Sequence, residues 1–256
     1  MNNSIIKFIG TGSGKTSLQR YHSSFIISHN GFNLLIDAGD GISKAFLSQN
    51  ISFSSINGIL LTHLHPDHFS GLASLIVQMK LTGRKNNLQI ILHRKLKKTV
   101  ENYFLSSYLF KERIKFALIF ETFEHNRIFS VHDSFRFICK QNSHLNKYKK
   151  YTSGKKLNFS SCSILFSLNE KNIFYTGDVG NKKDLYLFRD YRPDMIISEF
   201  THINIEDLTE ASGYFKPEKF FITHISDETE KYLEQKKSFL KRNNITAVVD
   251  GFTIRI

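Results

Sequence analysis

The stretch Thr62-His63-Leu64-His65-Pro66-Asp67-His68 decides how the chain is interpreted, because it carries four metal-ligand side chains within six positions. It follows an apolar run at 56–62 that predicts a buried strand, and apolar residues at helical spacing continue over 66–80. On an extended segment His63 and His65 point to one side and Leu64 to the other. Pro66 suits the first position of a helix, which places Asp67 and His68 in its first turn. Imidazole and carboxylate groups bind zinc and related cations, so the stretch predicts a metal site.

The composition is that of an ordinary globular chain with a large positive charge. Its 256 residues are 41% hydrophobic and carry 35 basic against 23 acidic side chains, a net charge of +12. This length can form a sizeable core, and we expect a single domain over 1–256. No apolar run approaches the roughly 20 residues that cross a bilayer, and no signal peptide is expected. Without such an apolar run we expect no membrane association. Cys139 and Cys162 are too few for a disulfide framework, so we expect a cytoplasmic location.

Strands and helices alternate along the chain. Turn-bounded β-branched runs predict strands at 4–9, 24–28, 33–37, 56–62, 88–93, 162–168, 172–176, 194–199, 219–223, 245–249 and 252–256, with short strands between 114 and 140. Helical patterns lie at 41–49, 66–80, 95–110, 181–190, 205–214 and 226–242. Two strand-rich halves with interleaved helices predict two sheets packed together with the helices outside.

Residues 10–16, GTGSGKT, look like a phosphate-binding loop but fail its pattern. Ile9 stands where the motif requires glycine, and the residues that follow have no amphipathic helical pattern. We therefore predict a glycine turn between two strands. A glycine loop that flanks a site formed elsewhere is the alternative.

In this context H-x-H-x-D-H resembles the signature of the metallo-β-lactamase superfamily. Further matches follow in order: LIDAGDG at 35–41, His144, YTGD at 175–178 and THIS at 223–226. The resemblance implies an α/β (α+β) fold, the four-layer αββα sandwich, with a mainly structural Asp37. It also implies two divalent ions, zinc with manganese or iron as alternatives. The implied ligands are His63, His65 and His144 for the first ion, Asp67, His68 and His224 for the second, and a shared Asp178.

The implied chemistry is metal-dependent hydrolysis. Two cations about 3.5–4 Å apart can hold a bridging hydroxide and clamp the oxygens of a displacement. Water near such cations has a pKa of about 7, so hydroxide is available at neutral pH. Asp67 is the residue we expect to orient that hydroxide and to accept its proton.

Within the superfamily the chain is most similar to the ribonuclease Z branch, on FIGTGSG at 8–14, Ser70-Gly71-Leu72 and the ending at 249–256. This implies a phosphodiesterase or endonuclease acting on RNA, and a homodimer. The chain also departs from that branch. Ser198 replaces the branch's leaving-group histidine, for which His202 and Glu199 are the candidates, and Tyr175 offers no acidic relay. Only 33 residues separate His144 from Asp178, too few for a long tRNA-binding arm.

Basic residues are concentrated in two segments. Residues 80–115 hold ten Lys and Arg against two Glu, and 140–156 hold six Lys, including Lys155 and Lys156, without an acid. Tyr148 and Tyr151 interleave the second segment, which suits phosphate binding and base stacking near His144. We therefore predict substrate contacts by Lys149, Lys150 and Tyr151, with a solvated lysine surface as the alternative.

Two other functions stay open at this point. One is a lactone, ester, thioester or β-lactam hydrolase on the same metal core, and the other is a non-catalytic, metal-stabilised protein that binds nucleic acid. A complete set of seven ligands favours catalysis, because a structural zinc needs only four. The remaining histidines are predicted to be surface or loop residues: His22, His29, His93, His125 and His132.

Overall fold

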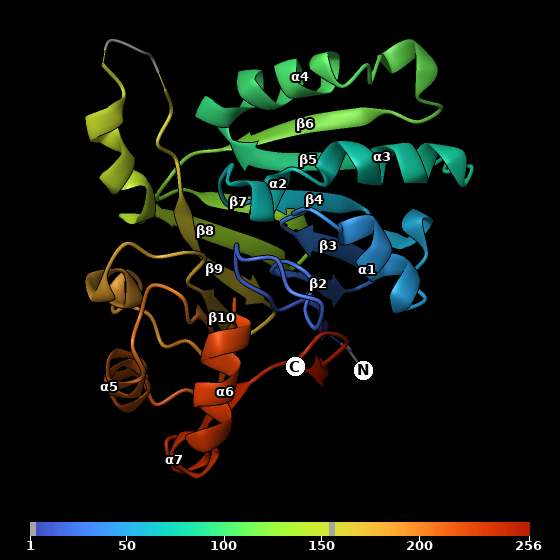
Figure 1. Ribbon diagram of the computed structural model, residues 1–256. Helices are drawn as coiled ribbons and strands as arrows, with labels where there is room; N and C mark the ends of the chain where they lie inside the picture. The colour runs from blue at the N-terminus through green and yellow to red at the C-terminus, as the bar shows by residue number, and fades with distance from the viewer. Residues whose placement is uncertain (1–3, 154–156) are drawn as a thin grey trace. The chain divides into compact units, whose positions relative to one another are not determined.

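The computed structural model describes residues 4–153 and 157–256, which form two compact units (Figure 1). The first unit comprises Met1–Glu124 with Asp250–Ile256, and the second comprises His125–Val249. Each unit contains one seven-stranded mixed sheet with its own helices, as the alternation of strand and helix patterns predicted. Whether the two units act as one domain over 1–256 stays a prediction. In the described part of the chain, no helix is long and apolar enough to span a membrane.

The first unit is built on a sheet of order β14-β1-β2-β3-β4-β5-β6. Its strands are β1 (Ile5–Gly10), β2 (Ser24–His29), β3 (Phe32–Ile36), β4 (Gly58–Leu61), β5 (Leu88–His93), β6 (Leu118–Phe123) and β14 (Thr253–Arg255). Its helices are α1 (Ile42–Ser48), α2 (Pro66–Phe69), α3 (Leu72–Leu81) and α4 (Lys97–Ser106), with short 3₁₀ turns η1 (Phe53–Ser55), η2 (Arg94–Leu96) and η3 (Lys111–Arg113). The apolar face of α3 packs on the buried strands β4 and β5, which anchors the end of β4 where the metal motif begins.

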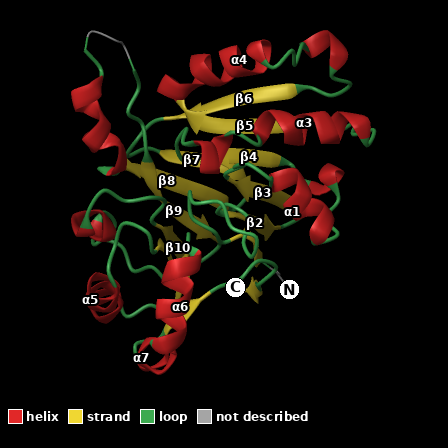
Figure 2. Cartoon of the chain, viewed as in Figure 1, coloured by secondary structure: helices red, strands yellow, loops and turns green. Residues whose placement is uncertain are grey.

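The second unit is built on a sheet of order β13-β12-β11-β10-β9-β8-β7, of which β7 to β10 are labelled in Figure 2. Its strands are β7 (Ile128–His132), β8 (Phe135–Gln141), β9 (Cys162–Leu168), β10 (Lys171–Tyr175), β11 (Met195–Glu199), β12 (Lys219–Thr223) and β13 (Ile245–Ala247). Its helices are α5 (Ile205–Phe215), α6 (Asp227–Gln235) and α7 (Lys237–Arg242), with 3₁₀ segments η4 (His144–Tyr151) and η5 (Lys182–Tyr186). Strands β10, β11 and β12 run parallel, so their carboxyl ends share one edge of this sheet.

Several elements differ from the sequence predictions. The helix expected over 66–80 is split into α2 and α3 at Ser70 and Gly71, and Gly71 lies so close to the backbone oxygen of Gly39 that no Cβ would fit there. The helix expected over 226–242 is interrupted between α6 and α7, and the one expected over 181–190 is the 3₁₀ segment η5. Residues 11–23 form a loop with one isolated bridge between β1 and β2, as predicted for the glycine-rich stretch.

Two histidines predicted to be surface or loop residues are buried strand residues instead. His29 ends β2 with 1% of its surface exposed, and its Nδ1 lies 2.7 Å from Ser4 Oγ. His93 ends β5 with 5% exposed, and burial lowers its pKa. Both side chains are therefore buried at the ends of strands, and the prediction that they are surface or loop residues was wrong.

Candidate metal centre

The end of β4 gathers three imidazoles and a carboxylate in the first unit. His63 follows the strand and is fully buried, and its ring centroid lies 4.7 Å from that of His65 and 4.2 Å from that of His68. Asp67 and His68 occupy the first turn of α2, with Pro66 at its start, as predicted. The Oδ2 atom of Asp67 lies 3.4 Å from Nε2 of His68. Four predicted ligands therefore meet where strand changes to helix.

Asp37 holds this ligand group in place from the end of β3. Its Oδ1 accepts a hydrogen bond from the Thr62 N–H at 2.8 Å, and its Oδ2 accepts from Thr62 Oγ1 and lies 2.8 Å from His68 Nδ1. Burial raises the pKa of Asp37, while His68 and the hydrogen bonds from Thr62 oppose that rise. Asp37 also has a positive φ of 59°, a conformation that is costly for a residue other than glycine. These contacts provide the structural role that the family resemblance implied.

The second unit brings together His144, Asp178 and His224, which follow β8, β10 and β12. Asp178 Oδ2 lies 3.6 Å from His144 Nε2, and Asp178 Oδ1 lies 3.6 Å from His224 Nε2. All three side chains are at least 97% buried. The two oxygens of one carboxylate thus face two different imidazoles, which is the arrangement that a carboxylate shared by two cations requires.

In each unit the histidines are held through their Nδ1 atoms, which suits metal binding through Nε2. A ligating imidazole usually uses its second nitrogen for a hydrogen bond within the protein, which fixes the ring and its tautomer. Here the Nδ1 atoms are held in this way, by Thr62 Oγ1 at 3.0 Å for His63, Val179 O at 3.3 Å for His144 and Thr201 Oγ1 at 2.9 Å for His224. Together with the Asp37–His68 contact, this pattern directs four Nε2 atoms away from their anchors. The donor set fits divalent cations.

The sequence did not indicate the residues that connect the loops of the second unit. Asp184 Oδ2 accepts from Ser143 N at 3.0 Å, from Ser143 Oγ at 2.6 Å and from Gly180 N at 2.8 Å. Asn142 Nδ2 donates to the Asp178 carbonyl at 2.9 Å. These bonds tie the loop of His144 to the loop of Asp178. Asn142 and Ser143 could have been noticed beside His144, but Asp184 has no local signal.

Glu199 and His202 form a pair beside the ligands. His202 Nδ1 lies 3.0 Å from Glu199 Oε1, and the His202 ring centroid is 4.9 Å from that of His144. Glu199 is 1% exposed and also accepts from the backbone N–H groups of Val179, Thr201 and His202. His202, whose side chain is 26% exposed, is therefore the accessible member of the pair, and Glu199 orients it. Ser198 is fully buried and donates to the Glu199 carbonyl, so it cannot take the role of the leaving-group histidine that it replaces.

The predicted substrate contacts lie on η4, the segment that His144 begins. Lys149, Lys150 and Tyr151 are exposed, and Lys150 Nζ lies 5.0 Å from the centre of the Tyr151 ring. The same pairing recurs one turn earlier, where Lys147 Nζ lies 5.3 Å from the Tyr148 ring. This surface is basic and aromatic, as expected. Lys155 and Lys156 lie outside the described residues.

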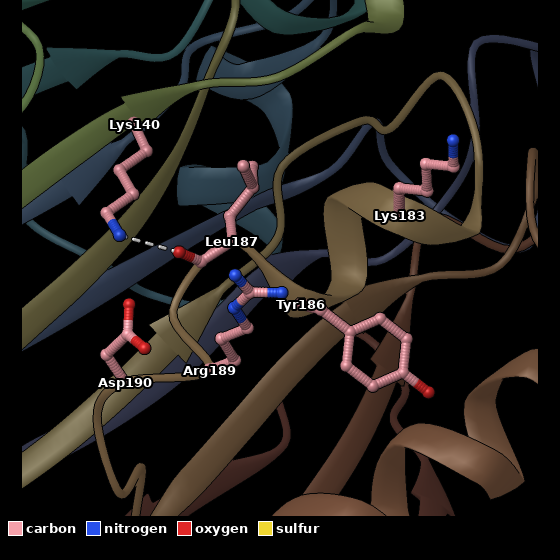
Figure 3. A pocket seen from close by; sticks show the side chains of 6 residues that line it. All are labelled: Lys140, Lys183, Tyr186, Leu187, Arg189 and Asp190. Atoms are coloured by element: carbon pink, nitrogen blue, oxygen red, sulfur yellow. Dashed lines mark hydrogen bonds between the residues drawn. The ribbon is translucent and has the colours of Figure 1, made fainter.

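A pocket of about 500 Å³ lies elsewhere in the second unit (Figure 3). Its lining residues are Lys140, Lys183, Tyr186, Leu187, Arg189 and Asp190. Lys140 Nζ donates to the Leu187 carbonyl at 2.7 Å and lies 5.1 Å from the Phe188 ring, so this lysine is engaged in holding β8 to the segment after η5. The lining includes none of the predicted metal ligands. Within the second unit, Glu199, His202 and His224 form a group that could hold a metal ion.

Comparison with known proteins supports the fold and the branch. The metallo-β-lactamase fold protein YhfI from Bacillus subtilis matches the whole chain and is itself covered completely, with a TM-score of 0.75 and 14% identity. Human tRNase Z, short form, matches over 98% of each chain, with a TM-score of 0.70 and 17% identity. These likenesses confirm the metallo-β-lactamase fold and its two mixed sheets with flanking helices.

A curated relative agrees with the predicted similarity to the ribonuclease Z branch. Ribonuclease Z of Saccharolobus islandicus is 38% identical over 92 residues, which are 36% of this chain and 32% of the relative. The match thus spans about a third of that protein's length. A family model described as "Anti-Pycsar protein Apyc1" matches residues 4–245, nearly the whole chain. The chain is therefore a member of the Apyc1 anti-Pycsar protein family, on a metallo-β-lactamase fold.

Proposed function

We propose that the chain is a metal-dependent phosphodiesterase that uses two divalent cations, with zinc, manganese and iron as candidates. As the family resemblance implies, His63, His65 and His144 would hold one cation, Asp67, His68 and His224 would hold the other, and Asp178 would bind both. The observation that carries this proposal is the position of Asp178, whose two oxygens lie 3.6 Å from Nε2 of two different histidines.

The bound cations would lower the pKa of water and neutralise the charge of a phosphodiester. Asp67 is the residue that orients the water and accepts its proton on Oδ2. That atom lies 3.4 Å from His68 Nε2, and the Asp67 side chain is 12% exposed, so the carboxylate is accessible. Asp37 keeps the His68 ring fixed, which in turn keeps this part of the site in one arrangement.

His202 donates a proton to the leaving oxygen in this proposal. A general acid must be held near the reacting atoms and remain accessible to them. Its Nδ1 is bound to Glu199 Oε1, which leaves Nε2 to face the substrate. Glu199 acts through His202 as a positioning residue, because its oxygens are occupied by hydrogen bonds from the protein. His202 would thereby replace the histidine that the ribonuclease Z branch has at the position of Ser198.

The proposed substrates are small phosphodiesters, with short RNA as the larger candidate. The 33 residues between His144 and Asp178 already contain η4, β9 and β10, which leaves no length for a tRNA-gripping arm. The exposed η4 residues Lys149, Lys150 and Tyr151 suit a phosphate and one stacked base. The homodimer and the cytoplasmic location stay predictions.

A substrate panel tests the proposal. The isolated protein, with its metal content measured, is assayed with Zn²⁺ or Mn²⁺ on bis-p-nitrophenyl phosphate, cyclic mononucleotides, short RNA and a lactone. We expect cleavage of at least one phosphodiester and its loss in His63→Ala. His132→Ala is the matched control, because this half-exposed histidine of β7 pairs with Asp133 at 3.2 Å and is not a predicted ligand. Cleavage of the lactone alone, or equal activity in His63→Ala, would overturn the proposal.

A further inference from the structure

The glycine loop between β1 and β2 touches the metal motif within the first unit. A Cβ atom added to Gly14 would lie 3.0 Å from Oδ2 and 3.3 Å from Cγ of Asp67. The tip of the loop therefore rests against the carboxylate that we assign to the attacking water. Glycine at this position allows the close approach of backbone to carboxylate.

The base of the loop is rigidly held. Asp250 Oδ1 accepts from Thr11 N at 2.8 Å and from Thr11 Oγ1 at 2.6 Å, and Asp250 Oδ2 accepts from Tyr21 N at 2.7 Å. Gly12 N donates to the Tyr21 carbonyl at 2.7 Å, and His22 Nδ1 lies 2.7 Å from the carbonyl oxygen of Ser13. Thr11 and Ser13 are buried, whereas Gly14, Lys15 and Thr16 are exposed. The loop thus presents a fixed base and an exposed cationic tip.

We propose that this tip, Gly14–Thr16, binds a non-bridging phosphate oxygen of the substrate, with Lys15 as the cationic contact. The inference rests on the proposed phosphodiesterase function and adds a substrate-binding residue to it. A lysine ammonium bound to a phosphate forms a charge-assisted hydrogen bond, and a preformed loop loses little entropy when it does so. GTGSGKT would then share with a phosphate loop the ability to bind phosphate but not the loop's fold. Ile9 and the missing helix exclude the usual nucleotide loop.

The test compares Lys15→Gln and Lys15→Arg with Lys98→Gln, an exposed lysine of α4 in the same unit. Binding of inorganic phosphate to the Mn²⁺-loaded protein is measured by calorimetry, and KM and kcat are measured on the cleaved phosphodiester. We expect Lys15→Gln to weaken phosphate binding and raise KM by about tenfold, with kcat changed by less than about threefold. Lys15→Arg should stay near wild type, and Lys98→Gln should change neither quantity.

The two readouts separate this inference from the proposed function. If the wild type cleaves phosphodiesters but Lys15→Gln binds phosphate as tightly as Lys98→Gln does, the role of the loop is wrong and the phosphodiesterase function stands. If the wild type cleaves none of them while Lys15→Gln alone loses phosphate, the loop binds phosphate and the proposed function is wrong. Thermal unfolding of each variant shows whether the loop change has altered folding.

Discussion

Replacing Asp37 with asparagine should weaken metal binding without removing a ligand. Asp37 Oδ2 faces both Thr62 Oγ1 and His68 Nδ1 at 2.8 Å, and Oδ1 accepts from Thr62 N at 2.8 Å. If the amide oxygen takes the Oδ1 position, the amide NH₂ meets His68 Nδ1 as a second donor. The His68 proton must then move to Nε2, the atom that a metal needs. If the amide turns over, the Thr62 N–H loses its acceptor instead.

The size of the effect follows from these contacts. Asp37 is fully buried, so solvent does not replace the lost bonds. A hydrogen bond to a charged group contributes about 1.5–3 kcal/mol, and the Thr62 hydroxyl can turn to accept from the amide, which leaves a net loss of one such bond. For metal binding this corresponds to a weakening of about 10–100-fold, the usual result of losing the hydrogen-bond partner of a ligating histidine.

Competition with a chromophoric chelator measures the zinc affinity, and thermal unfolding of the metal-free protein measures the change in stability. Asp194→Asn is the matched control, since Asp194 accepts from Asn172 N at 2.8 Å and from Lys171 Nζ at 3.1 Å. It should lose stability but keep its zinc affinity. Zinc affinity within twofold of wild type in Asp37→Asn would refute the assignment of Asp37 as the anchor of His68.

Three further outcomes are expected. Gly39→Ala should lower the free energy of unfolding by about 1–3 kcal/mol, because the new Cβ would overlap the Asp67 carbonyl oxygen; an unchanged thermal midpoint would contradict that contact. Glu199→Gln should lower kcat at least about tenfold with little change in KM, and adding His202→Ala should cause little further loss, whereas additive losses would mean independent roles. Asp178→Asn should reduce bound metal per chain in elemental analysis, and full occupancy would argue against a shared carboxylate.

The sequence predicted most of the fold because its signals are local. Buried apolar runs such as 88–93 coincide with the observed strand β5, and the helix start at Pro66 is observed as predicted. The helix predicted over 66–80 is two helices, α2 and α3, and the close contact of Gly71 between them is with Gly39, a distant part of the chain. Periodicity reports which residues face the core, and it carries no information about such contacts.

The anchors of the ligands were predictable only in part. Thr62 is adjacent to His63 in the chain, so its role could be inferred from the motif. Asp184 binds Ser143 across 41 positions, and Thr201 binds His224 across 23 positions. Side-chain hydrogen bonds of this kind depend on strand order and loop conformation, which a single sequence does not specify. The burial of His29 was missed for the same reason, because its partner Ser4 is 25 positions away.

Sheet topology explains why residues so far apart in the chain serve one chemistry within each unit. The parallel strands β10, β11 and β12 lead at their carboxyl ends into Asp178, Glu199 and His224, and parallel register brings these ends to one edge of the sheet. In the first unit β3 and β4 are also parallel, and their carboxyl ends carry Asp37 and the His63 motif. Functional groups collect at the carboxyl ends of parallel strands in open α/β sheets. A ligand and its anchor on neighbouring parallel strands therefore need not be close in sequence. We expect a substitution at either one to change metal binding first.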